Sequence, residues 1–380
     1  MRFFTLIFLS AIIFLQFSCT STRHSVTINE SSHLKFLDEF DVPYNFNFKN
    51  TVVGGLSGID YDQRENSYYL ISDDRSEKNP ARFYKAQITI DKNKIDTVIF
   101  DEVVTLKNNV GKPYPNSHND PYRTPDPEAL RHDPRKNILI WSSEGERIVR
   151  DDKKVLEDPS ITEIDPAGNY VDTFTLPNQL RMQATESGPR QNSVFEGLTF
   201  ADDYKTLFVN VEEPLYNDGS RAGLDDSTGI IRILKFGMRT KKPVAQYAYL
   251  IDPVAHPPVP ANGFKINGVP DILSIGDNKL LVIERSFSTG RMACTIKIYV
   301  ADLSGATDVN NISSLRNESN LKLISKKLLL NMDSLGIYID NIEGVTFGPR
   351  LSNGKSSLLF IADNNFNPLE KTQVLLFQVD

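Results

Sequence analysis

Acidic residues recur in register along this chain, at both ends of short apolar segments. The acids that open such segments are Glu128, Glu196, Asp271 and Glu343, and the acids that close the following segments are Asp73, Glu144, Glu212, Glu284 and Asp363. Carboxylates that gather at one place repel one another, which raises some of their pKa values or requires a cation. A hard ion with oxygen ligands meets that requirement, so we expect Ca²⁺, with Mg²⁺ as the alternative.

A cation held by these acids would polarise a phosphoryl or carbonyl oxygen and would lower the pKa of a bound water. The expected ligand is therefore a small anionic or ester substrate. The competing interpretation is that the acids are solvated turn residues at strand ends. Ser57 replaces the opening acid in the first unit, which would leave that sector open to a substrate.

Basic residues and histidines near these acids are the other candidates for chemistry. Arginine binds phosphate through two parallel hydrogen bonds, and the arginines in or beside the relevant segments are Arg75, Arg82, Arg190, Arg285 and Arg291. Pairing with a neighbouring acid is the alternative role for each of them. His118 and His256 are weak candidates for acid–base catalysis. The sequence assigns no catalytic base beyond these two.

The acids belong to five similar units that recur about every 70 residues, a period that suits four strands. The units begin SGIDYDQRENSYYLISDDR at Ser57, EALRHDPRKNILIWSSEGE at Glu128, EGLTFADDYKTLFVNVEEP at Glu196, DILSIGDNKLLVIERS at Asp271 and EGVTFGPRLSNGKSSLLFIADNN at Glu343. Each unit alternates dense β-branched and aromatic runs with turn residues. We predict an all-β β-propeller of four-stranded blades, five by repeat count, with six as the alternative.

The N-terminal strand is expected to close the ring. The last unit supplies three strands, and the segment LKFLDEFDV at 34–42 is available as the fourth. Successive antiparallel strands place the opening and closing acids at one mouth of the central channel. The long loops 107–127, 181–195, 213–229 and 252–270 are expected at the same mouth, and loop 303–320 at the opposite face.

The chain begins with Arg2 and an apolar run, followed by Cys19. We interpret residues 1–18 as a lipoprotein signal peptide, Cys19 as the lipidation site, 19–33 as a tether and 34–380 as a single propeller domain. An uncleaved anchor and an ordinary secretory signal are the alternatives. All three place the domain outside the cytoplasm, periplasmic or at the cell surface, and in the first it is bound to the bilayer through Cys19 only.

Composition excludes several classes of protein. The net charge is −7 and the basic residues are scattered, so nucleic acid is not an expected partner. Cys294 is the only other cysteine, which excludes a disulfide framework within the domain and metal sites made of cysteine. We expect a monomer.

Several motifs together resemble the phytase-like family of extracytoplasmic proteins, which carries the label of esterase-like activity of phytase. They are FEGLTFADDYKTLFVNVEEPL followed by DGS, LLVIERSFSTG, DNIEGVTFGP and LLFIADNNFNPLEKTQVLLFQV. The resemblance spans residues 34–380 and implies a β-propeller, a secreted or lipid-anchored location and hydrolysis of phosphoesters or esters. We therefore expect an extracytoplasmic, metal-assisted hydrolase of phosphomonoesters or other small esters. A non-catalytic binding propeller and a calcium-dependent lactonase-type propeller are the alternatives.

Overall fold

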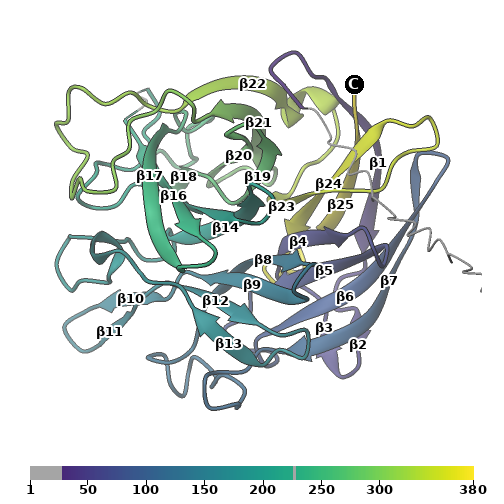
Figure 1. Ribbon diagram of the computed structural model, residues 1–380, viewed down its shortest axis with the longest axis horizontal. Coiled ribbons are helices and arrows are strands. Elements are labelled where there is room, and N and C mark those ends of the chain that lie inside the picture. Colours follow the sequence, from purple (N-terminus) through teal and green to yellow (C-terminus); the bar gives the residue numbers. More distant parts are fainter. Residues whose placement is uncertain (1–27, 226–227) are drawn as a thin grey trace, which may run out of the picture.

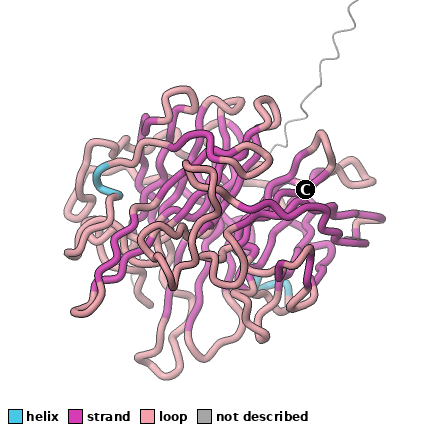
Figure 2. Tube along the Cα trace, turned by 90° about the horizontal axis from the view of Figure 1, so that it is seen from below, coloured by secondary structure: helices cyan, strands magenta, loops and turns pink. Residues whose placement is uncertain are grey.

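Five four-stranded blades form a ring around a central axis (Figure 1). The computed structural model describes residues 28–225 and 228–380, and within these ranges the helical structure is limited to two short 3₁₀ turns (Figure 2). The prediction of an all-β propeller with five blades is confirmed, and the six-bladed alternative is wrong. The signal segment and Cys19 lie outside the described residues. No helix in the described part is long and apolar enough to span a membrane.

The inner strand of each blade faces the axis, and the other strands follow outward. Blade 1 contains β4 (Leu56–Asp62), β5 (Ser67–Ser72), β6 (Arg82–Asp91) and β7 (Lys94–Thr105), and blade 2 contains β8 (Pro127–Asp133), β9 (Ile138–Ser143), β12 (Ser160–Ile164) and β13 (Tyr170–Thr173). Blade 3 contains β14 (Phe195–Ala201), β15 (Thr206–Val211), β16 (Ile230–Gly237) and β17 (Lys242–Leu250).

Blade 4 has a divided inner strand, made of β18 (Lys265–Gly268) and β19 (Ile272–Gly276), followed by β20 (Lys279–Ser288), β21 (Thr295–Asp302) and β22 (Ser325–Asn331). Blade 5 contains β23 (Asn341–Phe347), β24 (Ser356–Asp363), β25 (Thr372–Val379) and β1 (Leu34–Val42). Two hairpins lie outside the blades, β2 (Asn47–Phe48) with β3 (Thr51–Val52) and β10 (Glu146–Val149) with β11 (Lys154–Glu157). The 3₁₀ turns are η1 (Asn178–Leu180) and η2 (Met332–Leu335).

The N-terminal strand closes the ring, as predicted. β1 pairs antiparallel with β25 from Leu34 opposite Val379 to Val42 opposite Thr372. The ring of Phe36 meets that of Phe377 edge-on, with centroids 5.5 Å apart. The seam therefore combines backbone pairing with aromatic packing.

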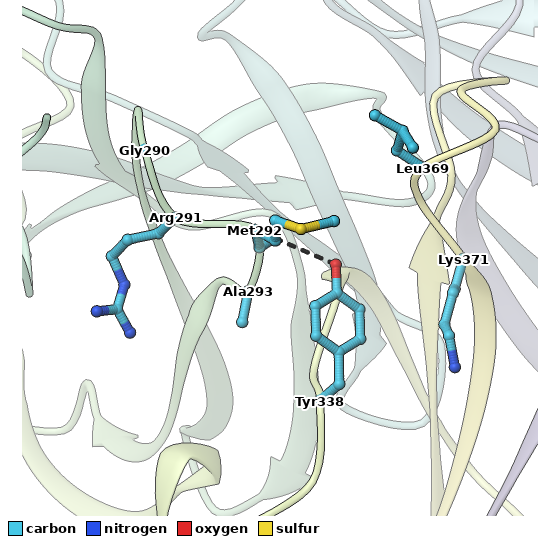
Figure 3. A pocket seen from close by; sticks show the side chains of 7 residues that line it. All are labelled: Gly290, Arg291, Met292, Ala293, Tyr338, Leu369 and Lys371. Carbon is cyan, nitrogen blue, oxygen red and sulfur yellow. Dashed lines mark hydrogen bonds between the residues drawn. The ribbon is translucent and has the colours of Figure 1, made fainter.

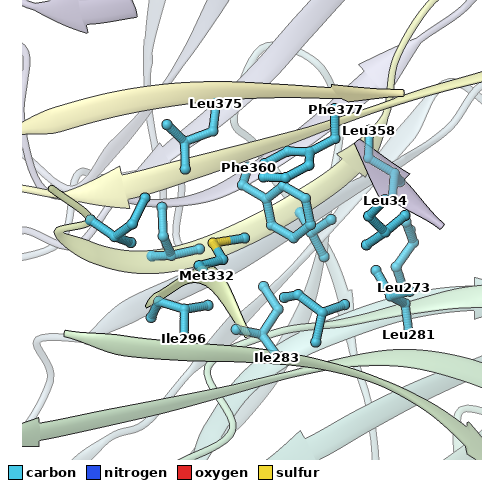
Figure 4. Close-up of a cluster of buried hydrophobic side chains, with 14 of the residues drawn as sticks. Leu34, Leu273, Leu281, Ile283, Ile296, Met332, Leu358, Phe360, Leu375 and Phe377 are labelled. Atoms are coloured by element: carbon cyan, nitrogen blue, oxygen red, sulfur yellow. The ribbon is translucent and has the colours of Figure 1, made fainter. Parts of the chain in front are cut away.

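The hydrophobic core lies between neighbouring blades rather than within one of them. Figure 4 shows the cluster between blades 4 and 5, where Ile283 and Ile296 of blade 4 face Phe360 and Leu375 of blade 5. Alternate residues of a strand point to opposite faces. Each middle strand therefore fills two such clusters, which explains why these strands read as unbroken apolar runs.

The register of blade 4 differs by one residue from the sequence alignment. In blade 3, Leu198 pairs with Val209. The corresponding pair in blade 4 is Ile272 with Val282, and both residues face blade 3 in the way that Leu198 and Val209 face blade 2. The aligned repeat had placed Leu273 at this position, so the fourth unit is displaced by one residue.

The displacement changes which side chains reach the channel mouth. Glu196 lies two residues before Leu198, and the residue two before Ile272 is Pro270. Likewise, Glu212 lies three residues after Val209, and the residue three after Val282 is Arg285. Blade 4 therefore contributes a cation to a position where the other blades contribute carboxylates.

Loop 303–320 corrects a second expectation. It leaves β21 on the opposite face, but Val309 N donates to Gln246 O of β17 at 2.8 Å, so the loop runs along the outer edge of blade 3. Farther on, Leu315 N donates to Asp218 Oδ1 at 2.8 Å. Since Asp218 lies in loop 213–229, loop 303–320 reaches the face of the acidic mouth near Leu315 before it returns to the start of β22.

Candidate metal centre

The inner strands place the opening acids through β-bulges. The pairing of β8 with β9 is interrupted between Pro127 and Leu130, and the pairing of β14 with β15 between Phe195 and Leu198. Glu128 and Glu196 lie within these bulges, and Glu343 lies in the equivalent bulge of β23. A bulge redirects its side chains out of the regular alternation. These three carboxylates can therefore lie at the channel mouth instead of between the blades.

The closing acids are fixed at the ends of the second strands. The backbone N–H groups of Asp73, Glu144 and Glu212 donate to the carbonyls of Gly55, Asp126 and Val194, at 2.6, 3.1 and 2.8 Å respectively. Close backbone approach is required here, because a Cβ on Gly197 would lie 2.5 Å from Asp271 Cα. The crowded axis explains why Gly follows Glu196.

Two triads of carboxylates converge and share Glu128. Oxygens of Asp73, Asp126 and Glu128 lie within 4.8 Å of one another, and so do oxygens of Glu128, Glu144 and Glu196. Except for the partly exposed Asp73, these residues are buried. We call the five residues the acid cluster. Of the predicted ligands, the structure brings together Glu128, Glu196, Asp73 and Glu144.

Arg285 holds two further acids beside the acid cluster. Its Nη2 lies 2.6 Å from Glu212 Oε1, and its Nη1 lies 3.4 Å from Glu343 Oε1. Asp363 completes this side: Oδ1 accepts from Asn365 N at 2.8 Å, whereas Oδ2 is buried without a hydrogen-bond partner among the described residues. The mouth thus contains more carboxylates than its arginine can neutralise.

Burial and mutual repulsion raise the pKa values of these carboxyls. Burial is the largest cause for Glu128 and Glu196, whose pKa values rise well above the usual range, and neighbouring carboxylates add to it. Burial raises the pKa of Asp126 to about 6 against the opposing charge of Arg75. It raises the pKa of Glu343 to about 7 against the opposing charge of Arg285. The carboxyls therefore ionise together only with difficulty unless a cation joins them.

The donor set fits a hard divalent cation. All candidate ligand atoms are carboxylate oxygens, and the buried, unpartnered Oδ2 of Asp363 shows that the site has acceptor capacity that protein donors leave unused. Ca²⁺ takes six to eight oxygens in flexible geometry, which suits acids contributed by separate strands. The acid cluster could therefore hold a metal ion.

Two predicted ligands lie elsewhere. Asp271 accepts from both Arg131 Nη2, at 2.7 Å from Oδ2, and Val345 N at 2.8 Å. Glu284 accepts from Tyr249 Oη at 2.8 Å and pairs with Lys326. The one-residue displacement of blade 4 explains both placements, so we remove Asp271 and Glu284 from the candidate ligands.

The predicted substrate-binding arginines are distributed over different places. Arg82 is buried and pairs with Asp74 at 2.7 Å, so it has a structural role. Arg75 pairs with Glu146, and its Nε lies 3.7 Å from Asp126 Oδ2, which places it at the edge of the acid cluster. Arg285 lies within the mouth, as described above.

Arg291 lines a pocket of about 630 Å³ between blades 4 and 5 (Figure 3). Met292, Leu369 and Tyr338 form much of its wall, and the hydroxyl of Tyr338 donates to the carbonyl of Met292 at 3.2 Å. The lining of this pocket is more apolar than polar. Arg190 lines a second pocket, which is polar.

Neither candidate histidine reaches the acid cluster. His118 is 77% exposed, with Nε2 3.6 Å from Glu77. His256 Nε2 lies 3.9 Å from Asp333. Their partners are outside both triads, so neither histidine is placed to exchange a proton with a group bound there.

Sequence reasoning missed Asp126. This residue precedes β8 in the loop sequence Pro-Asp-Pro, outside the repeated pattern, and its backbone N donates to Ser143 Oγ at 3.0 Å. Its carboxylate lies within 4.8 Å of those of Asp73 and Glu128. Ser57, which replaces the opening acid of blade 1, donates through Oγ to the carbonyl of Glu128 at 2.6 Å. The only signal in the sequence was an acid two residues before Glu128.

Comparison with known proteins identifies a family. The sequence profile described as phytase-like, esterase-like activity of phytase, matches residues 51–366. No curated protein matches the chain.

Similar solved structures include an α-L-arabinofuranosidase from Lactobacillus brevis (9% identity, TM-score 0.44, covering 86% of this chain and 91% of that one). Another is a gluconolactonase from Xanthomonas campestris (11% identity, TM-score 0.36, 92% and 90%). A third is an endo-1,4-β-xylanase from Bacteroides thetaiotaomicron (8% identity, TM-score 0.44, 85% and 90%).

Proposed function

This chain belongs to the phytase-like family, and we propose that it is an extracytoplasmic, metal-assisted hydrolase of phosphomonoesters or other small esters. The observation that carries the proposal is the convergence of two buried carboxylate triads on Glu128 at one mouth of the channel. A Ca²⁺ ion bound there would supply a Lewis acid for a phosphoryl or carbonyl oxygen and a water of lowered pKa.

The residues around the acid cluster have separable roles in this proposal. Glu128 and Glu196 would hold the ion together with Glu144, Asp73 and Asp126. Arg285 remains protonated, because Glu343 and Glu212 raise its pKa although burial alone would lower it. Arg285 therefore fixes two carboxylates in position without being able to act as a base.

Arg75 and Glu157 form the polar edge of the cluster next to Asp126. The buried Oε2 of Glu157 has no hydrogen-bond partner among the described residues, and burial raises the pKa of Glu157 to about 8 despite the nearby charge of Arg75. A carboxyl with that pKa is protonated at neutral pH. Glu157 is thus the candidate donor of a proton to a leaving group, and Arg75 is the candidate contact for an anionic one.

Metal content and a substrate panel test the proposal. The purified protein would be treated with EDTA and then assayed with Ca²⁺ or Mg²⁺ against chromogenic phosphomonoesters, carboxylic esters and lactones. We expect metal-dependent hydrolysis of phosphomonoesters or esters that Glu128→Gln abolishes. Hydrolysis confined to lactones would favour the lactonase-type alternative.

A non-catalytic binding propeller is the second candidate function. It is favoured by the exposed side chains of Met292 and Leu369 beside the mouth, which are 66% and 70% exposed. Large exposed apolar side chains on a rim are typical of partner contacts. A protein that binds Ca²⁺ but hydrolyses no member of the panel would support this candidate over the hydrolase.

The proposed attachment to the membrane depends on Cys19. Lipidation there would hold the propeller outside the cytoplasm on a tether of 19–33. In the wild type the mature protein should partition with membranes and carry the mass of a lipidated Cys19. Cys19→Ala should release the protein from membranes, and unchanged partitioning and mass would contradict the lipoprotein interpretation.

A further inference from the structure

A polar pocket of about 560 Å³ lies where loop 213–229 of blade 3 meets loop 303–320 of blade 4. The residues that line it are Glu186, Arg190, Tyr216, Asn217, Gly219, Ser220, Ser314 and Arg316. They come from three separate segments of the chain, whose side chains converge only because loop 303–320 crosses the edge of blade 3. The pocket is thus a product of the tertiary structure.

Specific contacts hold the two loops together at the pocket. Ser314 Oγ donates to the carbonyl of Asn217 at 2.5 Å, and Arg316 Nη2 donates to the carbonyl of Tyr216 at 3.0 Å. Below them, the buried Arg232 pairs with Asp218 at 2.7 Å and also donates to Ile312 O at 2.9 Å. Arg232 therefore fixes both loops, so the pocket does not depend on its surface contacts alone.

Two guanidinium groups in the pocket have no acidic partner. Arg190 donates through Nε to Pro214 O at 2.8 Å and through Nη2 to Gly219 O at 2.9 Å, and it stacks on Tyr216 at 4.1 Å. These partners orient the guanidinium but do not neutralise it. Among the residues that the structure describes, neither Arg190 nor Arg316 forms an ion pair with a carboxylate.

The fully buried arginines differ from Arg190 and Arg316 in having carboxylate partners. Each of these has a carboxylate within 2.7 Å, and they are Arg82 with Asp74, Arg131 with Asp271 and Arg232 with Asp218. A fully buried guanidinium requires such a partner. Arg190 is partly buried and Arg316 is exposed, so neither requires one. Burial, and next the charge of Arg221, lower the pKa of Arg190, whereas Tyr216, Glu213 and Glu186 act in the opposite direction.

The surroundings keep the pocket positive. Glu186 is the carboxylate among the lining residues, and it is exposed at the rim. A further guanidinium, that of Arg147, lies 5.0 Å from the ring of Tyr216. An anion that entered the pocket would therefore meet more positive than negative charge.

We propose that this pocket binds a phosphate or sulfate group through Arg190 and Arg316. A guanidinium presents parallel N–H donors that match the oxygens of such a group, and the Arg190 guanidinium is already held in place by two carbonyls and one ring. Pre-organisation of this kind lowers the entropic cost of binding.

The chain connects the pocket to the channel mouth. Arg190 donates to the carbonyl of Pro214, two residues after Glu212 at the mouth. Binding of an anion in the pocket does not depend on the proposed hydrolase function.

Titration of the metal-free protein with inorganic phosphate and with sulfate tests the proposal. EDTA is kept present so that no cation at the acid cluster recruits the anion, and ionic strength is held constant so that general screening is unchanged. We expect saturable binding of at least one of the two anions. Arg316→Gln should weaken that binding about tenfold, since it removes one charge-assisted contact.

The choice of variants separates recognition from folding. Arg316→Gln removes one surface bond, to the carbonyl of Tyr216, but the buried Arg232 still fixes both loops, so the thermal stability should be preserved. Arg190→Gln removes two bonds to loop 213–229. Arg150→Gln is the matched control, because Arg150 is an exposed arginine of the β10–β11 hairpin outside the pocket. Absence of saturable binding of both anions, or binding that Arg316→Gln and Arg150→Gln affect equally, would overturn the proposal. A wild-type protein that binds the anion but hydrolyses no member of the substrate panel would refute only the proposed hydrolase function.

Discussion

Arg131 and Asp271 form a buried ion pair across the central channel, with Nη2 2.7 Å from Oδ2 and side chains only 2% and 0% exposed. Arg131 belongs to β8 of blade 2, and Asp271 precedes β19 of blade 4. The same guanidinium donates to the carbonyls of Ile59 in blade 1 and Val345 in blade 5, at 2.5 and 3.2 Å. One side chain therefore links four blades at the axis, three residues after the shared ligand candidate Glu128.

Arg131→Met should destabilise the protein by about 3–5 kcal/mol, because it leaves the Asp271 carboxylate buried without its partner. Chemical denaturation followed by fluorescence of Trp141 measures the change. The double variant Arg131→Met with Asp271→Asn should recover a large part of the loss, since it removes both charges. If the double variant is as unstable as the sum of the single variants, the pair is not coupled as described.

Glu128→Gln should weaken Ca²⁺ binding more than any other single amide substitution in the acid cluster, because Glu128 belongs to both triads. Isothermal titration calorimetry measures the affinity directly. Binding should also raise the melting temperature of the wild type, since a ligand at one hundred times its dissociation constant stabilises the folded state by about 2.7 kcal/mol. Asp151→Asn, at an exposed acid outside the cluster, is the control and should bind Ca²⁺ normally. Equal binding by both variants would contradict the assignment.

The metal-free protein should lose stability as the pH rises. Burial raises the pKa of Glu343 from 4.5 to about 7, so the folded state binds this proton more tightly than the unfolded chain does. The resulting stability is complete below about pH 4.5 and declines as the pH passes through about 7. In EDTA, the melting temperature at pH 8 should therefore be lower than that at pH 5. Ca²⁺ should reduce this difference. A melting temperature that rises between these pH values in EDTA would contradict the expected repulsion.

Removal of β1 should destabilise the ring by several kcal/mol, because it exposes the edge of β25 and uncovers buried apolar side chains such as Phe377 and Val379. A chain that begins after Val42 would be compared with one that begins at Ile28, by thermal and denaturant unfolding. Equal stability of the two chains would show that β1 is dispensable for closure.

The repeated pattern was enough to predict the blades, their number and the closing strand. Each unit contains a short apolar strand and a second, denser apolar strand, and four of the five units open with an acid. The antiparallel geometry then places Glu128 and Glu196 at one mouth. These predictions depend on local patterns and on the alternation of strand direction. Both are properties that a sequence carries directly.

The parts that the sequence did not predict depend on register and on contacts between distant segments. Blade 4 divides its inner strand at Val269–Asp271, and its pair equivalent to Leu198 with Val209 is Ile272 with Val282, so Arg285 and not Glu284 lies at the mouth. Asp126 joins the acid cluster from a position, two residues before the repeat, where the other units have no acid. The anion pocket exists only because loop 303–320 follows the edge of another blade. None of these features produces a repeating pattern in the amino-acid sequence.

The seam between β1 and β25 also imposes an order on folding. β1 is synthesised first, yet its partner ends at Val379, so the pair joins residues from opposite ends of the chain and must wait for the last strand. Contacts of such long sequence separation form slowly. During this interval β1 offers an unpaired edge, and its polar positions carry the charges of Lys35, Asp38, Glu39 and Asp41. Charges on a free edge oppose pairing with another chain, so the strand that closes the ring is protected from aggregation until its partner arrives.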